Sequence, residues 1–313
     1  MPSPRTGLAP LLGLGAAAAG AGLAYASLVE LRWFALRRAD LPVLPQGHRP
    51  LKLLHLSDLH LTPNQRAKQE WVRDLAALEP DLVVDTGDNL AHPDAVAPLL
   101  EALDQLLDLP GVFVFGSNDY FAPTLRNPVR YLFPDDGRRA THAPPLPWRD
   151  LRDGFEKRGW SDLTNRRAEL VVGDTSFAFA GVDDPHLDYD ELDAVAGPAD
   201  PTADVRLGVA HAPYLRVLDQ FASDGYDAIL AGHTHGGQVC LPGRGALVTN
   251  CDLEPARAKG LHRHPADAAP GVPGGSWLHV SAGLGTSPYA PVRFCCRPEA
   301  TLLTLTPAAG LAP

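Results

Sequence analysis

Several short polar motifs along the chain contain the side chains that hold divalent metal ions in proteins. They are Asp58-Leu59-His60, Gly87-Asp88-Asn89, Asn118-Asp119, His211, and the pair His233 and His235. Ca²⁺ takes only oxygen ligands, whereas a mixture of carboxylate, imidazole and amide suits Mn²⁺, Fe²⁺, Zn²⁺ or Co²⁺. Side chains two residues apart in an extended segment point to the same side, so Asp58 and His60 can reach one ion together. The sequence therefore predicts a site for such ions.

Each motif alone also has a plain structural explanation. An aspartate after a strand often caps a helix, and a single histidine is more often a packed structural residue than a ligand. For Gly232-His233-Thr234-His235-Gly236-Gly237 the structural alternative is an ordinary turn. Two histidines between glycines are hard to explain by packing, and glycines also let a substrate approach the backbone closely. This motif therefore favours a binding site over a turn.

The polar motifs follow predicted strands, which an α/β core would bring to one edge of a sheet. Short apolar runs predict strands, and longer amphipathic runs between them predict helices. The predicted strands are Leu51–Leu56, Leu82–Asp85, Val112–Phe115, Val205–Ala210, Ala228–Ala231, Trp277–Val280 and Thr301–Leu305, with a hairpin of Glu169–Val172 and Ser176–Ala180. The predicted helices are Gln69–Leu78, Ala95–Leu107 and Tyr214–Ala222. Because ligands of open α/β sheets collect outside the carboxyl ends of the strands, we expect the motifs to converge on one crevice.

The stretch 120–158 does not fit this alternation. It is rich in proline and arginine, Arg126 among them, and is long for a loop. Long loops in compact domains are usually functional or disordered. One hypothesis is a cap whose guanidinium groups bind an anionic head group, since they match phosphate oxygens. The alternative is a solvated loop.

Composition limits the class of protein. The 313 residues suffice for one large α/β domain with a sizeable core, or for two small domains. The formal net charge is −10, which repels nucleic acid phosphates, so we expect no nucleic acid partner. None of the 4 cysteines has the CxxC spacing of a zinc or redox site. Cys295 and Cys296 are adjacent and would point to opposite faces of a strand, so buried thiols are the simplest interpretation.

The N-terminus predicts attachment to a membrane. No charged residue occurs from Thr6 to Val29, and this length meets the requirement of about 20 residues for a spanning helix. The residues that follow resemble a juxtamembrane collar: Arg32, Trp33, Phe34, Arg37 and Arg38. The positive-inside rule then places the C-terminal domain in the cytoplasm. The alternative is a cleaved signal peptide, because Ala24-Tyr25-Ala26 fits the cleavage pattern. We expect a transmembrane anchor and collar at 1–39 and a Pro-rich linker at 40–50.

The order and spacing of the polar motifs resemble the signature of the calcineurin-like metallophosphoesterase family, over residues 51–306. The matching motifs are Asp58-Leu59-His60, Gly87-Asp88, Asn118, His211 and Gly232-His233-Thr234-His235. Near the C-terminus, Gly283-Leu284-Gly285-Thr286-Ser287, Pro291-Val292-Arg293-Phe294 and Pro298-Glu299 look like the signature of a membrane-associated bacterial phosphodiesterase branch. The resemblance implies a four-layer α/β/β/α sandwich with two central mixed β-sheets.

The resemblance also implies a role for each motif. One divalent ion would be held by Asp58, His60 and His235, and a second by Asn118, His211 and His233. Asp88 would bridge the two ions, together with a hydroxide that attacks phosphorus. Two such cations acidify the attacking water and clamp the phosphoryl oxygens, and a carboxylate between them reduces their repulsion. Asp88 and His233 would therefore be catalytic residues as well as ligands, and Asn118 would also contact the substrate.

One position departs from the family pattern, which usually reads Gly-Asn-His-Asp/Glu with a histidine that assists the leaving group. The run here is Gly116-Ser117-Asn118-Asp119-Tyr120, and we interpret Asp119 as occupying the histidine position. An aspartate is ionised at neutral pH unless burial or a nearby anion raises its pKa. Either Asp119 is held protonated and acts as the catalytic acid, or the leaving group is assisted by His92 or by an arginine of 120–158, such as Arg126. The family's second aspartate after Gly87-Asp88 is also absent.

These observations predict a metal-dependent hydrolase of phosphodiesters or phosphomonoesters. A lipid-linked ester, of the UDP-diacylglucosamine type or phospholipid-like, is one substrate class that would suit the membrane segment. The alternative is a non-catalytic scaffold that binds metal or phosphate and has lost the histidine proton donor. All the presumed ligands persist, and carboxylates crowded together without metal would be costly. The balance therefore favours an enzyme.

Overall fold

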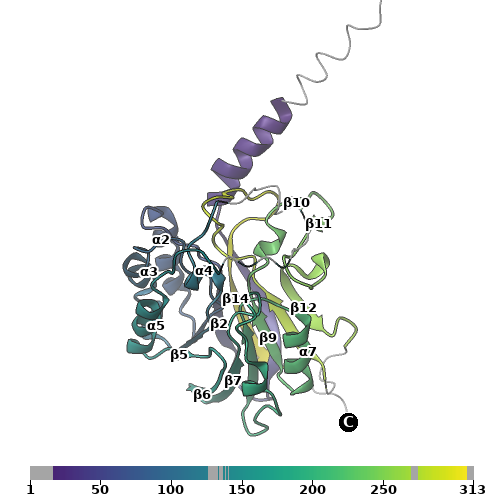
Figure 1. The fold of residues 1–313 in the computed structure, drawn as a ribbon. Coiled ribbons are helices and arrows are strands. Elements are labelled where there is room, and N and C mark those ends of the chain that lie inside the picture. The colour runs from purple at the N-terminus through teal and green to yellow at the C-terminus, as the bar shows by residue number, and fades with distance from the viewer. Residues whose placement is uncertain are drawn as a thin grey trace, which may run out of the picture.

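Two mixed six-stranded sheets form the centre of the protein (Figure 1). The computed structural model describes residues 17–125, 133, 137, 139, 141–268 and 274–308. The first sheet has the order β1 (Ala35–Leu44), β14 (Glu299–Pro307), β2 (Leu51–Leu56), β3 (Leu82–Asp85), β4 (Gly111–Phe113) and β5 (Ser161–Asp162). The second has the order β12 (Gly260–His264), β13 (Ser276–Val280), β9 (Ala228–Ala231), β8 (Val205–Ala210), β7 (Thr175–Gly181) and β6 (Arg166–Val172).

Helices cover the outer face of each sheet (Figure 1). The first sheet is covered by α2 (Arg66–Asp74), α3 (Val96–Leu103) and α5 (Trp148–Lys157), and the second by α6 (Leu192–Val195) and α7 (Leu215–Ser223). The short helix α4 (Ser117–Tyr120) follows β4, and a small hairpin joins β10 (Cys240–Leu241) to β11 (Gly245–Ala246). The four layers confirm the predicted α/β/β/α sandwich with two mixed sheets.

The central strands have apolar side chains on both faces. Leu53 of β2 packs with Phe179 of β7 in the core between the sheets, whereas Leu54 packs with Leu99 of α3 on the outer side. Strands β2, β3 and β4 are parallel, as are β7, β8 and β9. Parallel strands buried on both faces read as continuous apolar runs, which is why β2, β3, β8 and β9 were predictable to the residue. Their carboxyl ends present the polar motifs together.

The predicted collar and linker are partly wrong, because residues 35–44 form strand β1. It pairs in parallel with β14, from Ala35 opposite Glu299 to Leu44 opposite Pro307. Proline can occupy an edge strand, where one side of the backbone has no partner, so Pro42 does not exclude the strand. Residues 40–44 are therefore part of the sheet. The predicted insertion 120–158 also contains an ordered helix, α5, whose Leu151 and Phe155 are buried in the core.

The N-terminal segment contacts the catalytic domain through Glu30. Residues 17–24 are helical and continue into a π-helical turn, Tyr25–Val29. The Glu30 side chain is buried and accepts backbone N–H bonds from Cys295 (3.0 Å) and Cys296 (2.5 Å). Within the described residues, no helix is long and apolar enough to span a membrane. Residues 1–16, where the predicted anchor begins, lie outside the described residues.

We expect Glu30→Ala to lower the free energy of unfolding by about 2 kcal/mol, because the substitution leaves two backbone N–H groups without their charged acceptor. Urea unfolding of the full chain measures the change. Glu70→Ala, at an exposed position of α2, is the matched control and should change stability by less than about 0.5 kcal/mol. Equal stability of the two variants would contradict the docking of the N-terminal segment through Glu30.

Candidate metal centre

Most of the predicted ligands have a backbone conformation that residues other than glycine rarely adopt. The φ angles are positive at Asp58 (50°), His60 (41°), Asp88 (57°), His233 (68°) and His235 (50°). Each such residue costs on the order of 1–3 kcal/mol, and the conformation persists only where the surroundings enforce it. Strain of this kind concentrates at functional sites. Its presence at five predicted ligands favours a functional site over a turn.

Cross-bonds between the loops enforce these conformations. The Asp58 N–H donates to Gly87 O (2.8 Å), and the His60 N–H donates to Asp88 O (2.9 Å), so the loops after β2 and β3 run side by side. A side chain at Gly232 would collide with Ser57 and Asp58. Glycine at this position therefore lets the β9 loop of the second sheet reach the β2 loop of the first.

Four predicted ligands form one buried cluster. The members are Asp58, His60, Asp88 and His235, whose ligand atoms all lie within 4.8 Å of one another. His60 Nε2 lies 3.2 Å from His235 Nε2 and 3.4 Å from Asp88 Oδ2. His235 Nδ1 lies 3.0 Å from Gly285 O. If this nitrogen donates its hydrogen to the carbonyl oxygen, the lone pair of the neutral ring is on Nε2. Carbonyl partners of this kind orient metal-binding histidines, so the donor set fits a divalent cation between these side chains.

His211 approaches the other oxygen of the Asp88 carboxylate, and the His233 ring lies 5.2 Å from the His211 ring. His211 Nε2 is 3.5 Å from Asp88 Oδ1, is buried, and has no hydrogen-bond partner among the described residues. When His211 Nδ1 donates to Thr86 O (2.7 Å), the neutral ring has its lone pair on Nε2. Similarly, His233 Nε2 lies 3.1 Å from Asn250 O, which assigns the lone pair of the neutral ring to Nδ1. The Asp88 carboxylate thus lies between two sets of imidazoles.

Asn118 contacts the same carboxylate. Its backbone N–H donates to Asp88 Oδ1 and its side-chain amide nitrogen donates to Asp88 Oδ2, both at 2.7 Å. To bind a cation, the amide would have to turn its carbonyl oxygen toward the ion. The structure therefore brings Asn118 to the site, and its role as a ligand stays a prediction.

The buried charges perturb one another. Burial raises the pKa of Asp58 to about 6 and that of Asp184 to about 7, although the nearby charge of His211 lowers both pKa values. Burial also lowers the pKa of His60 to about 4. Burial acts against the charged form of His211 as well, but Asp88, Asp184 and Asp58 outweigh it and raise the pKa of His211 to about 9. A region that concentrates carboxylates in this way is suited to a cation, which favours their ionised forms.

The structure shows contacts of the Asp119 carboxylate that the sequence did not predict. The side chain is fully buried, and its two oxygens accept backbone N–H bonds from Asp88 (2.8 Å), Asn89 (2.8 Å), Leu90 (3.3 Å) and Gly116 (3.0 Å). Burial and the charge of Asp88 raise the pKa of Asp119, and these amide donors oppose the rise. A proton on either oxygen would displace an amide donor. Asp119 therefore fixes the Asp88 loop, and its role as the catalytic acid stays a prediction.

The two predicted substrate contacts outside the cluster are not supported in the same way. His92 is half-exposed, and its Nδ1 accepts the backbone N–H of Asp94 (3.1 Å). It is not a member of the buried four-residue cluster. Arg126 lies outside the described residues. Neither residue therefore gains a role from the structure.

Three supporting residues were not predicted. Lys68 is buried and donates from Nζ to Leu59 O (2.7 Å), between two ligands. Arg293 is fully buried, and its Nη2 donates to Ala282 O and Gly285 O (both 2.7 Å), which holds the loop against His235. The His186 ring lies 4.5 Å from the His233 ring. Only His186, which follows β7, and Arg293, in a quoted motif, had a sequence signal.

Comparison with known proteins agrees with this geometry. The family model described as calcineurin-like phosphoesterase matches residues 51–237, which is more than half of the chain. Phosphodiesterase YaeI of Escherichia coli (strain K12) is 25% identical over 301 residues, with 92% of this chain and 94% of YaeI covered. The uncharacterized protein YpbG of Bacillus subtilis (strain 168) is 27% identical over 197 residues, and this alignment covers 62% of the chain but only 64% of YpbG.

Among solved structures, phosphopantetheinyl hydrolase (PptH) of Mycobacterium tuberculosis matches with a TM-score of 0.41 and 12% sequence identity. The match covers 87% of this chain and 99% of that one. The family match and the buried aspartate and histidine cluster lead to one conclusion. The chain belongs to the calcineurin-like phosphoesterase family and is a metal-dependent hydrolase of phosphoric ester bonds.

Proposed function

We propose that this enzyme hydrolyses phosphodiesters with two divalent cations that share Asp88. The observation that carries the proposal is the position of the Asp88 carboxylate. Its Oδ2 lies 3.4 Å from His60 Nε2, and its Oδ1 lies 3.5 Å from His211 Nε2. One cation would be held by Asp58, His60, Asp88 and His235. The second would be held by Asp88, Asn118, His211 and His233. Mn²⁺, Fe²⁺, Zn²⁺ and Co²⁺ all suit this donor set.

The side chains of the site orient the reacting groups. When bound, a pair of cations supplies the charge that acidifies an attacking water and neutralises the phosphoryl oxygens. The carbonyl groups of Gly285, Thr86 and Asn250 contact one ring nitrogen each of His235, His211 and His233, whose other ring nitrogens would hold the cations. Because phosphoryl transfer depends mainly on positioning and charge neutralisation, this preorganisation supports a hydrolytic role.

The choice of phosphodiesters rests on the similarity to YaeI, which is named a phosphodiesterase. Phosphomonoesters use the same metal chemistry and are the alternative substrates. The scaffold hypothesis depended on a lost proton donor at Asp119. That residue instead accepts four backbone N–H bonds, so its identity does not argue against turnover. A lipid-linked substrate stays a proposal that depends on membrane association.

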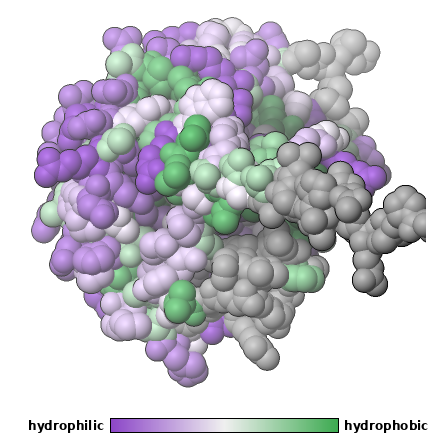
Figure 2. Space-filling view, turned by 90° about the horizontal axis from the view of Figure 1, so that it is seen from above, coloured by the Kyte–Doolittle hydropathy of each residue, from purple (hydrophilic) through white to green (hydrophobic). Residues whose placement is uncertain are grey.

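We also propose that the N-terminal segment associates with a membrane, on its cytoplasmic side. The support is the uncharged stretch Thr6–Val29 together with exposed apolar side chains on its described part, at Leu23 (62%), Leu28 (63%) and Val29 (50%). Trp33 is also exposed, and its ring lies against Arg297. Figure 2 views the face from which this segment rises, and hydrophobic side chains interrupt its polar surface. Tryptophan and arginine side by side are typical of membrane interfaces.

Replacement of the shared carboxylate should abolish both metal sharing and turnover. We expect Asp88→Ala to lower kcat/KM for bis(p-nitrophenyl) phosphate by at least about 10³-fold after chelation and reloading with Mn²⁺. The number of bound metal ions per chain, measured by metal analysis, should fall from two to one or none. Asp94→Ala, at an exposed aspartate of the same loop region, is the control and should keep both values. One ion per chain in the fully active native enzyme would contradict the two-metal proposal.

Asp119→Asn tests the role of the buried carboxylate. The substitution points an amide NH₂ at backbone donors, so we expect a loss of about 2–3 kcal/mol in the free energy of unfolding. Urea unfolding measures this loss of stability. The variant should lose the same fraction of kcat/KM on substrates with p-nitrophenyl and with alkyl leaving groups. Native stability with a loss confined to alkyl leaving groups would instead identify Asp119 as a proton donor, because nitrophenolate leaves without protonation.

Leu28→Glu tests membrane association. The charge should weaken co-sedimentation of the full chain with anionic phospholipid vesicles, because the exposed side chain could no longer enter the apolar layer. Val171→Glu, at a 70% exposed position on the edge strand β6, is the matched control and should sediment like the native chain. Equal sedimentation of the two variants would argue against contact through this segment.

A further inference from the structure

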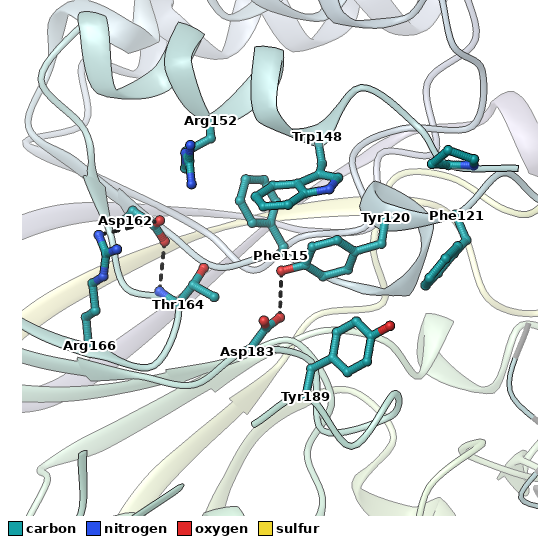
Figure 3. A pocket seen from close by; sticks show the side chains of 11 residues that line it. Phe115, Tyr120, Phe121, Trp148, Arg152, Asp162, Thr164, Arg166, Asp183 and Tyr189 are labelled. Atoms are coloured by element: carbon teal, nitrogen blue, oxygen red, sulfur yellow. Dashed lines mark hydrogen bonds and ion pairs between the residues drawn. The ribbon is translucent and has the colours of Figure 1, made fainter. Parts of the chain in front are cut away.

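A cavity of about 410 Å³ lies beside the metal centre and takes no part in metal binding. Its walls come from the end of β4, helices α4 and α5, and the loops after β5 and β7 (Figure 3). Pockets of roughly 300–1,000 Å³ are the usual size for small-molecule ligands. The cavity is therefore large enough for an organic group that is attached to the reacting phosphate.

The cavity adjoins the metal centre through two pairs of neighbouring residues. Tyr120 lines it and follows Asp119, which holds the backbone amide of Asp88. Asp183 also lines it and precedes Asp184, a buried carboxylate whose charge acts on His211. The Tyr120 hydroxyl donates to Asp183 Oδ1 (2.8 Å) and so joins the walls contributed by the two sheets. The residues that line the cavity are thus sequence neighbours of residues that contact the predicted metal ligands.

The walls of the cavity are mainly aromatic. Trp148 meets Tyr120 and Phe115 edge to face, with ring centroids 5.1 and 5.7 Å apart. Tyr189 meets Tyr120 in the same way at 5.6 Å and is 38% exposed. These rings surround a space that an aromatic ligand would fill with further edge-to-face or offset-stacked contacts. An aromatic wall alone would also accept an alkyl chain, so the polar groups decide between the two.

The polar side of the cavity favours a ring with hydrogen-bond acceptors. Thr164 Oγ1 and Arg152 Nε are buried, and neither has a hydrogen-bond partner among the residues that the structure describes. A buried polar group without a partner costs about 1–3 kcal/mol, which a ligand acceptor would recover. An alkyl chain offers no acceptor. A heterocycle offers acceptors on its edge, namely carbonyl oxygens and ring nitrogens.

The charges of the cavity argue against a second anionic group. Arg166 lies 3.8 Å from Asp162, and Arg152 lies 3.8 Å from Asp153 and 4.0 Å from Glu156. Each guanidinium of the cavity therefore already has a carboxylate beside it. A phosphate would have to compete with these carboxylates, whereas a neutral ring would not. The charge distribution fits a neutral, planar ligand.

We infer that this cavity binds a planar heteroaromatic ring of the nucleobase kind, attached to the phosphoester that the enzyme cleaves. The inference rests on the proposed phosphodiesterase function and specifies its substrate class. Tyr120, Trp148 and Tyr189 contact the faces and edges of the ring, and Thr164 and Arg152 donate to its acceptors. In this inference the metal centre would hold the phosphate of the same substrate molecule.

The test compares three diesters that share the p-nitrophenolate leaving group and differ in the other group: thymidine 5′, methyl or octyl. With the full chain loaded with Mn²⁺, we expect kcat/KM to be highest for the thymidine ester. Thr164→Val and Tyr189→Ala should each lower the ratio of kcat/KM for the thymidine ester to that for the methyl ester by about tenfold, since one hydrogen bond or stacking contact to the ring is lost. Tyr289→Ala, at an exposed tyrosine outside the cavity, is the control.

A binding measurement separates this inference from the proposed function. Thymidine, which has no phosphate, should quench the fluorescence of Trp148 in the metal-free full chain, and Trp148→Phe identifies the signal. If no ester is hydrolysed but thymidine still quenches, the phosphodiesterase proposal fails and the cavity assignment stands. Equal rates for thymidine and methyl esters, a preference for the octyl ester, or no quenching by thymidine would each overturn the assignment.

Discussion

The arrangement of the site depends on one buried carboxylate, that of Asp88. A buried anion is unfavourable unless donors or cations surround it, and here Asn118, His60 and His211 all approach its two oxygens. These partners come from both sheets, so the carboxylate also joins the two halves of the sandwich. The Asp119 carboxylate in turn accepts a hydrogen bond from the backbone N–H of Asp88 and so fixes the Asp88 backbone. The positions of the loops follow from the need to enclose this charge.

The two sheets supply the loops in a similar manner. In the first sheet the parallel strands β2, β3 and β4 are followed by Asp58, Asp88 and Asn118, and in the second β8 and β9 are followed by His211 and His233. Aspartates and the asparagine thus come from one half, and most of the histidines from the other. The donor set becomes complete only when the sheets pack together. The apolar core between them, with Leu53 against Phe179, therefore positions the chemistry as well as stabilising the fold.

The sequence predicted those parts in which local pattern and tertiary structure agree. Buried parallel strands are apolar throughout, so their limits and the polar residues after them were predictable. Strand β1 was missed because it is an edge strand with Arg37, Arg38 and Pro42, and its pairing with β14 joins residues about 260 positions apart. The four backbone N–H bonds to Asp119 were not predictable for a related reason. Motif order indicates which residues meet, but the direction of a carboxylate depends on backbone amides that no motif encodes.

The same features that prepare the site make it costly to the fold. Five predicted ligands have positive φ angles, and burial raises the pKa of Asp58 and Asp184, so the isolated protein bears strain and crowded carboxylates at one place. A cation that binds the folded chain and not the unfolded chain recovers part of this cost by linkage. Stability and metal occupancy are therefore coupled in this family member. A loop that was relaxed in the absence of metal would have no such coupling, and its ligands would have to be ordered at the moment of binding.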